Sequence, residues 1–111
     1  MHAWNSKGNT LNELGKYGEA LICFERALEL DPKYVHAWNG KGNAHYGLGK
    51  YDDALINFEK AIELDPNFVH AWNGKGYALY ELGKYNDALI CFEEALAETF
   101  CLWDLRGIAR S

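Results

Sequence analysis

Asparagine side chains recur four residues apart at two places in the chain. Asn5 is followed by Asn9, and Asn39 is followed by Asn43, so each pair would lie on one face of a helix. A carboxamide both donates and accepts hydrogen bonds, which matches the N–H and C=O groups of an extended peptide backbone. The spacing indicates either a ladder of amides that binds a peptide or ordinary solvated helix surface, and it leaves both open.

Phenol and imidazole rings occur in the same segments. Tyr46, Tyr77 and Tyr80 would give a bound peptide stacking and apolar contact area. The histidines recur every 34 residues, at His2, His36 and His70. Copies in neighbouring units of a helical array lie about 10 Å apart, whereas zinc holds its ligand atoms within about 2.0–2.3 Å. We therefore interpret the histidines as polar surface and expect no metal site.

Two further patterns do not support catalysis. Cys23 and Cys91 occupy equivalent places two units apart, too far to pair, and with Cys101 we interpret them as packing residues. The glycines of residues 42–47 have the spacing of a phosphate loop, but Leu48 follows where such a loop needs Lys. We expect no catalytic residues, no cofactor and no enzymatic activity.

The composition excludes several classes of partner. The 111 residues suffice for a single domain with a modest core. Eleven Lys and Arg against sixteen Asp and Glu leave a net charge of -5, which argues against nucleic acid and against an anionic membrane, because both attract basic surfaces. No apolar run is long enough to span a bilayer, and no basic segment leads into an apolar stretch. Three cysteines are too few for a disulfide scaffold, so we expect a cytoplasmic location.

One unit is written three times along the chain. Residues 3–36 and 37–70 are identical at 22 of 34 positions, and residues 37–61 and 71–95 at 19 of 25. Such self-similarity predicts a tandem repeat architecture. We assign one domain over residues 1–111, with units 1–34, 35–68 and 69–99 and a truncated fourth unit or terminal helix at 100–111.

Each unit has the pattern of two helices joined by a tight turn. In the first unit Trp4 and Gly8 share one helical face, and Gly15 stands where a helix ends in a left-handed residue. A second apolar stripe follows, formed by Ala20, Leu21, Phe24, Ala27 and Leu28. Asp31-Pro32 then stops the second helix, because Pro cannot continue a helix.

This pattern closely resembles the tetratricopeptide repeat family. The matching positions of the first unit, which recur in the later units, are Trp4, Gly8, Leu11, Gly15, Tyr17, Ala20, Phe24, Ala27 and Pro32. The resemblance covers residues 1 to about 97. It implies an all-α fold, a right-handed solenoid of three antiparallel helix pairs plus a C-terminal helix. It also implies that the first helix of each pair lines the concave side, which is the usual binding surface.

The resemblance places the polar residues of the first helices on that concave side. We predict a peptide-binding groove lined by Asn5, Asn9, His36, Asn39, Asn43, Tyr46, His70, Asn73, Tyr77 and Tyr80. Other residues off the buried face are His2, Ser6, Asn12, Glu13, Gly40, Gly47, Gly74 and Glu81. We expect the central contacts to come from Asn39, Asn43, Asn73 and Tyr77. Gly40 and Gly74 are unexpected inside helices, and either close approach of a ligand to the backbone or drift after duplication explains them.

Family members that bind chaperone tails hold a terminal carboxylate with Lys and Arg on this same face. The matching positions of this sequence carry Asn5, Asn9, Gly40, His70 and Gly74. Because this cationic clamp is absent, the resemblance does not extend to the binding of acidic C-terminal tails.

The sequence departs from the family pattern in three ways. A lysine replaces an apolar residue in each first helix, at Lys7, Lys41 and Lys75. A lysine stem can lie along apolar surface while its ammonium reaches water, so the fold tolerates this change. His45 stands where the other units have Leu, and Thr99-Phe100 stands where they have Asp-Pro. Asn57 also stands between the equivalent cysteines of the first and third units.

The last residues resemble the start of a fourth unit when Trp103 is set beneath Trp72. Two outcomes stay open. The tail forms a short separate helix that covers the end of the array, or it fuses with the preceding helix, since no strong stop occurs before Gly107. A fused helix would carry one apolar stripe of Leu89, Phe92, Leu96, Phe100 and Trp103. Such a stripe invites self-association, for which we predict Leu96, Phe100, Trp103 and Ile108.

The predicted function is that of a protein–protein interaction module that binds a peptide segment in the concave groove. The alternative is a structural repeat protein that oligomerises through its exposed terminal helices. The expected partner is therefore a protein or peptide, or a second copy of the chain through the C-terminal helix, and neither nucleic acid nor a membrane.

Overall fold

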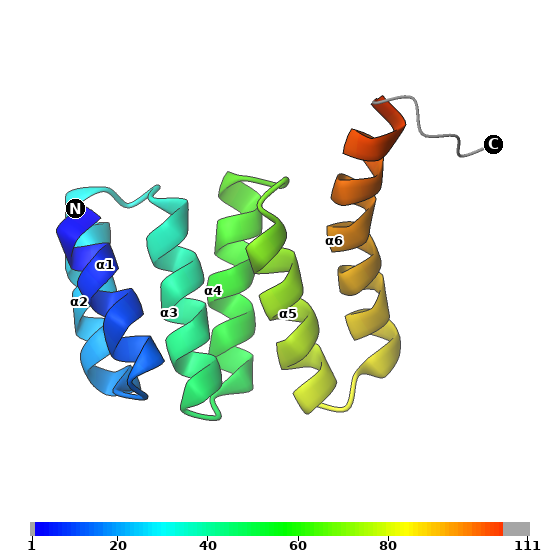
Figure 1. Cartoon of the computed structure of the whole chain (residues 1–111). Helices are drawn as coiled ribbons and strands as arrows, with labels where there is room; N and C mark the ends of the chain where they lie inside the picture. Colours follow the sequence, from blue (N-terminus) through cyan, green and yellow to red (C-terminus); the bar gives the residue numbers. More distant parts are fainter. Residues whose placement is uncertain (1, 106–111) are drawn as a thin grey trace.

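The computed structural model describes the backbone of residues 2–105 and the side chains of residues 2–97. This part of the chain forms six α-helices and no strand (Figure 1). The helices are α1 His2–Glu13, α2 Tyr17–Leu30, α3 Val35–Gly47, α4 Tyr51–Leu64, α5 Val69–Glu81 and α6 Tyr85–Leu105. The prediction of an all-α repeat fold is confirmed. Within the same residues, no helix combines the length and the apolar character that crossing a membrane requires.

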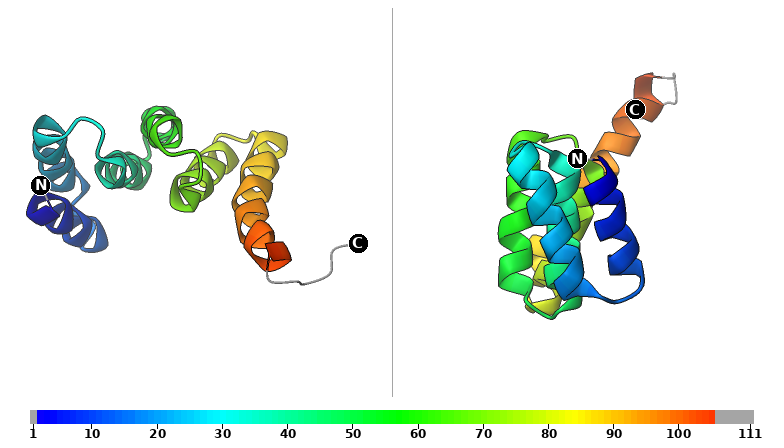
Figure 2. Two further views of the ribbon diagram at one scale, coloured as in Figure 1. Left: turned by 90° about the horizontal axis from the view of Figure 1, so that it is seen from above. Right: turned by 90° about the vertical axis from the view of Figure 1, so that its left-hand side faces the viewer.

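The helices pair in chain order and stack in a single row (Figures 1 and 2). Helix α1 packs on α2, α3 on α4 and α5 on α6, and each of α2 and α4 also packs on the first helix of the next pair. The first helices α1, α3 and α5 approach one another, whereas α2, α4 and α6 do not. The row is therefore a solenoid, and its inner side is formed by α1, α3 and α5.

A glycine in the left-handed conformation ends the first helix of every pair. The φ angles of Gly15, Gly49 and Gly83 are 79°, 78° and 81°, a backbone conformation that side chains disfavour. At the first turn the Lys16 N–H donates to the Leu11 carbonyl at 2.8 Å, as in a helix C-cap. These glycines confirm the predicted turns and bring the two helices of each pair side by side.

Phenylalanine rings held between glycines set the distance between helices. Phe24 and Phe58 are fully buried. A Cβ atom on Gly8 would lie 2.7 Å from the Phe24 ring, and one on Gly40 would lie 2.3 Å from it, so only a residue without a side chain leaves room for the ring. The Phe58 ring is held in the same way, with Gly74 on one side. Packing therefore explains Gly40 and Gly74, and neither ligand access nor drift is needed.

A tryptophan connects each later first helix to the preceding unit. The Trp38 indole N–H donates to the Pro32 carbonyl at 2.8 Å. Lys41 Nζ lies 5.4 Å from the centre of the same indole and 3.9 Å from Glu25 Oε2. The next junction repeats these contacts with Trp72, Pro66, Lys75 and Glu59. The lysines that depart from the family pattern thus cover an indole face, a contact of about 0.5–1 kcal/mol at exposed sites.

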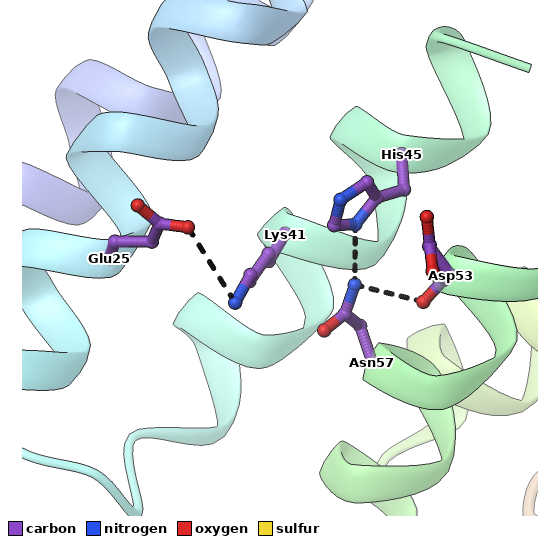
Figure 3. A network of polar contacts seen from close by, with 5 residues as sticks. All are labelled: Glu25, Lys41, His45, Asp53 and Asn57. Carbon is purple, nitrogen blue, oxygen red and sulfur yellow. Dashed lines mark hydrogen bonds and ion pairs between the residues drawn. The ribbon is translucent and has the colours of Figure 1, made fainter. Parts of the chain in front are cut away.

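The two polar departures of the second unit contact each other (Figure 3). The buried Asn57 donates from Nδ2 to His45 Nδ1 at 2.6 Å and to the Asp53 carbonyl at 3.0 Å. Because a carbonyl only accepts, the contacting atom of Asn57 is its amide nitrogen, and His45 Nδ1 is then an acceptor. Burial lowers the pKa of His45 below its usual 6.5, although the Asp53 carboxylate opposes the change.

Helix α6 runs without a break through the third junction. At the first junction the Asp31 carboxylate accepts a hydrogen bond from the Lys33 N–H at 3.1 Å, and Pro32 follows directly. Thr99-Phe100 provides neither the carboxylate nor the proline. Helix α6 therefore continues to Leu105 and projects beyond the row (Figure 1). Of the two outcomes for the tail, the structure has the fused helix, and residues 2–105 contain no separate seventh helix.

Replacing Gly40 by Ala tests the packing of Phe24. The added Cβ would meet the ring at 2.3 Å, so the ring or α3 must move, which we expect to lower the free energy of unfolding by about 1–3 kcal/mol. Gly18→Ala is the control, because Gly18 is also helical but a Cβ there meets nothing within 4 Å. The control should keep or slightly raise stability. Urea denaturation followed by circular dichroism measures both variants, and equal stabilities would contradict the proposed packing.

The His45–Asn57 pair predicts a coupling between two substitutions. His45→Leu alone leaves a buried N–H of Asn57 without its partner, and Asn57→Cys alone leaves His45 Nδ1 without its donor, so each should cost about 1–3 kcal/mol. The double variant has the Leu and Cys of the first and third units and should recover most of that loss. Denaturant unfolding of the four proteins gives the coupling energy, and additive losses would contradict the pairing.

The same proteins test the effect of pH. Since the folded chain has the lower His45 pKa, the unfolded chain binds more protons just below pH 6.5. The stability conferred by neutral His45 should therefore fall as the pH drops through 6.5 and stop changing below the lowered pKa. The double variant should lack this component when the free energies of unfolding at pH 7.5 and 5.0 are compared.

Candidate binding groove

Two adjoining hollows lie on the side of the row formed by α1, α3 and α5. The first has a volume of about 620 Å³ and is lined by Asn9, Asn12, Glu13, Tyr17, Asn43, Tyr46 and Gly47. The second has a volume of about 470 Å³ and is lined by Tyr46, Tyr77, Tyr80, Glu81 and Phe92. Tyr46 lines both, so the two hollows form one continuous surface, which we call the groove. We name them the amide hollow and the aromatic hollow.

The two hollows are lined by residues at equivalent positions of successive units, but the side chains at these positions differ. Asn43 of the amide hollow corresponds to Tyr77 of the aromatic hollow, and Gly47 corresponds to Glu81. The residues that line the two hollows include the carboxylates Glu13 and Glu81 and no Lys or Arg. The groove can therefore form many hydrogen bonds and its lining carries negative charge.

In the amide hollow, one amide is used by the fold and two face outward. Asn12 Nδ2 donates to the Gly40 carbonyl at 3.2 Å and so links α1 to α3. Asn9 and Asn43 line the hollow and are exposed. Each of these two amides presents both a donor and an acceptor to a bound chain.

In the aromatic hollow, a phenol and a carboxylate are linked. The Tyr46 O–H donates to Glu81 Oε2 at 3.0 Å. Burial and this hydrogen bond raise the pKa of Tyr46 to about 12, so the phenol remains a donor at neutral pH. The ring centres of Tyr77 and Phe92 are 5.1 Å apart in edge-to-face contact. One wall of the hollow is thus formed by the rings of Tyr77 and Phe92, and another by the Glu81 carboxylate with its hydrogen bond from Tyr46.

The structure divides the ten predicted groove residues into four groups, the last of which is His36 and His70 in a separate row of rings. Five of them line the hollows, namely Asn9, Asn43, Tyr46, Tyr77 and Tyr80. Asn39 and Asn73 are half-buried, so of the four expected central contacts only Asn43 and Tyr77 line a hollow. Asn5 is 8% exposed, and its assignment to the exposed face is wrong. It lies two turns before Asn12, on the strip of α1 that faces α3.

The histidines form a separate row with other aromatic rings. His36 is in edge-to-face contact with Tyr34 at 5.5 Å and with Phe68 at 5.2 Å between ring centres. Phe68 also contacts His70 at 5.6 Å, and His2 Nδ1 lies 2.8 Å from the Tyr34 hydroxyl. An aromatic ring thus separates each histidine from the next. In the described part of the chain, no group of three His, Cys, Asp or Glu side chains is arranged to hold a metal ion.

The outer face of α6 carries exposed apolar side chains. Leu89 and Leu96 are exposed and Phe92 is half-buried, although the equivalent Phe58 is fully buried by the following unit. Of the residues predicted for self-association, Leu96 is exposed. The side chains of Phe100 and Trp103, and all of Ile108, lie outside the described residues.

Six residues that line the groove are not among the ten predicted ones. Four of them, Asn12, Glu13, Gly47 and Glu81, were placed off the buried face of the first helices. The other two were not expected on this surface, because both belong to second helices. Tyr17 begins α2 beside the turn, and Phe92 lies in α6 with its ring uncovered on one side. A tyrosine recurs at Tyr17, Tyr51 and Tyr85, and this recurrence next to each turn was the available signal.

The buried cysteines have the features expected of packing residues. Cys23 and Cys91 are both buried and unpaired. Burial raises the pKa of the Cys91 thiol, which keeps it in the less nucleophilic protonated form. Cys101 lies outside the described side chains.

Comparison with known proteins agrees with this geometry. Models described as tetratricopeptide repeat match residues 35–68 and 57–90, and a model described as TPR repeat matches residues 8–49. A comparison with the curated proteins gives no significant match.

Several solved structures share the fold. The second TPR of Spaghetti (RPAP3), bound to the HSP90 peptide SRMEEVD, is 29% identical with a TM-score of 0.81, over 86% of this chain and 88% of that chain. The first TPR of the same protein with the same peptide is 26% identical with a TM-score of 0.82, over 86% and 76% of the two chains. MamA, at 24% identity and a TM-score of 0.84 over 93% and 60% of the chains, shows the likeness of the fold.

Proposed function

Because this chain belongs to the tetratricopeptide repeat family, we propose that it is a protein–protein interaction module that holds a peptide segment in its groove. The observation that carries the proposal is the pair of adjoining hollows that share Tyr46 on the inner side of the row. A peptide in extended conformation lying along α1, α3 and α5 would pass through both. The structurally similar RPAP3 domains bound to an HSP90 peptide support the same mode of use.

Asn9 and Asn43 are the residues proposed to hold the peptide backbone. Both are exposed in the amide hollow, on the adjacent helices α1 and α3. An amide that faces a peptide unit can donate to its C=O and accept from its N–H. Two such amides on adjacent helices would hold the backbone of the bound chain without recognising its side chains.

The charge of the groove sets this proposal apart from the binding of an acidic tail. The peptide SRMEEVD carries three acidic side chains, and the lining of this groove carries Glu13 and Glu81 with no Lys or Arg. An acidic segment would meet repulsion rather than pairing. We therefore propose that the bound segment is neutral or basic.

Peptide-library capture followed by substitution of both amides tests the backbone contacts. Asn9→Ala with Asn43→Ala removes two hydrogen-bonding side chains at about 0.5–1.5 kcal/mol each, so the captured peptides should bind about tenfold more weakly in isothermal titration calorimetry. The control pair is Asn67→Ala with Asn86→Ala, two exposed asparagines that do not line the groove. Unchanged affinity of the Asn9 and Asn43 variant for every captured peptide would contradict the role of the amides.

Self-association through α6 is a second candidate, favoured by the exposed Leu89 and Leu96. A second copy adding its α1 as the next unit would place Ser6 where Gly40 and Gly74 lie against phenylalanine rings. The Cβ of Ser6 has no room in such a contact. We therefore propose a symmetric contact in which the α6 faces of two copies meet.

Light scattering over a hundredfold range of concentration tests the α6 contact. Leu96→Asp should convert any dimer to monomer, because a charge in an apolar interface is costly to bury. Ile22→Asp is the matched control, since Ile22 on α2 is 57% exposed and Leu96 is 56% exposed. A monomer at all concentrations, or equal dissociation of both variants, would exclude the contact.

A further inference from the structure

We infer that the aromatic hollow is a subsite for one arginine side chain of the bound peptide, an inference that rests on the proposed function. The amide hollow also has a carboxylate and two tyrosine rings, from Glu13, Tyr17 and Tyr46, whereas the aromatic hollow has four aromatic rings around one carboxylate. The hollow takes its rings from α3, α5 and α6 and its carboxylate from Glu81 of α5. Its volume of about 470 Å³ is within the range of about 300–1,000 Å³ that is common for ligand sites.

The tyrosine rings of the hollow are both accessible and held in place. Tyr77 and Tyr80 are 56% and 55% exposed, so their surfaces are available to a ligand. Tyr80 is in edge-to-face contact with Tyr85 at 5.1 Å between ring centres, and Tyr46 is in similar contact with Tyr51 at 5.3 Å. The faces of aromatic rings carry negative potential and attract cations within about 6 Å. Rings fixed in advance lose little conformational freedom when a cation binds.

Glu81 gives the hollow a negative charge, and one hydrogen-bond donor to its carboxylate is already present. Glu81 Oε2 accepts a hydrogen bond from the Tyr46 hydroxyl, which holds the carboxylate against the rings. A carboxylate accepts about four hydrogen bonds, so most of its capacity remains. None of the ion pairs formed within residues 2–97 involves Glu81. The carboxylate is thus available to a cation that the partner supplies.

A guanidinium group matches these features better than the other side chains do. It is planar, so it stacks on tyrosine faces, and its fork of N–H donors fits a carboxylate. A lysine ammonium is a compact, strongly hydrated charge that does not stack in this way. An apolar side chain would cover Glu81 without satisfying it, and an acidic one would be repelled.

The neighbouring units show that this combination is local. The positions of Tyr77, Tyr80 and Glu81 are occupied by Asn9, Asn12 and Glu13 in the first unit and by Asn43, Tyr46 and Gly47 in the second. At these three positions, only the third unit has two phenols and a carboxylate. A bound peptide would thus be held through its backbone in the amide hollow and through one arginine in the aromatic hollow.

The test measures binding of a blocked amino acid to the full chain by NMR. The probe is N-acetyl-arginine methylamide, and the comparison is N-acetyl-citrulline methylamide, which has nearly the same shape without the charge. We expect the arginine probe to shift the ring signals of Tyr77 and Tyr80, and the citrulline probe to bind at least about tenfold more weakly.

Three variants locate the probe. Glu81→Gln removes the charge but keeps an acceptor for the Tyr46 hydroxyl, and Tyr77→Asn introduces the residue that the other two units carry. Each should weaken binding of the arginine probe at least about fivefold. Glu13→Gln is the control, because Glu13 is the equivalent carboxylate in the amide hollow, and it should change the dissociation constant less than about twofold.

The possible results separate this inference from the proposed function. Equal binding of the citrulline probe, or no effect of Glu81→Gln, would overturn the arginine subsite. Tighter binding of N-acetyl-trimethyllysine methylamide than of the arginine probe would overturn it in favour of a quaternary ammonium site. Captured library peptides without arginine, whose binding depends on Asn9 and Asn43, would leave the peptide module standing and remove only the subsite. Binding of the arginine probe together with a failure to capture any library peptide would keep the arginine site and contradict the peptide-binding function.

Discussion

The contact of a phenylalanine ring with two glycine α-carbons sets the geometry of the whole molecule. Phe24 lies against Gly8 of its own pair and Gly40 of the next, at distances that leave no room for a side chain. A rigid ring bounded by bare backbone on both sides limits how closely the helices can approach and leaves no void between them. Because both glycines are on first helices, α1, α3 and α5 come close while the second helices stay apart. The inner side of the row, and with it the groove, follows from that spacing.

The period and helix boundaries were predictable because they depend on local patterns. Identities 34 residues apart, an apolar stripe in each half and a glycine or proline at each turn identify six helices without any knowledge of their packing. The errors arose where one first helix meets the next. Asn5 and Gly40 were assigned to the exposed face, but both are buried. The assignment failed because the periodicity of a single helix does not show which strip of its surface faces the neighbouring first helix.

The second unit shows how the core accommodates polar residues. His45 and Asn57 were each noticed as departures from the other units, but only the fold brings them to 2.6 Å. A buried hydrogen bond between two changed residues satisfies both, whereas either alone would leave a polar atom without a partner.

The length of helix α6 also follows from a local change in the sequence. Helix α6 continues past Thr99 because the Asp-Pro stop signal is missing there. The sequence showed this loss, but it did not decide between one fused helix and two separate helices.

The division between packing and binding residues explains how one repeated scaffold can carry two kinds of surface. The helix positions whose backbone lies against the rings of Phe24 and Phe58 are glycines, namely Gly8, Gly40, Gly42 and Gly74. Positions that line the groove vary from unit to unit, so that Asn43 in one hollow becomes Tyr77 in the next. Exposed side chains contribute little to stability, so the residues at these positions can change to suit the ligand without loss of the fold.

Phe92 belongs to both classes, because its ring packs on Gly76 on one side and lines the aromatic hollow on the other. The aromatic hollow thus combines a half-buried core ring with the side chains that are particular to the third unit, Tyr77 and Glu81.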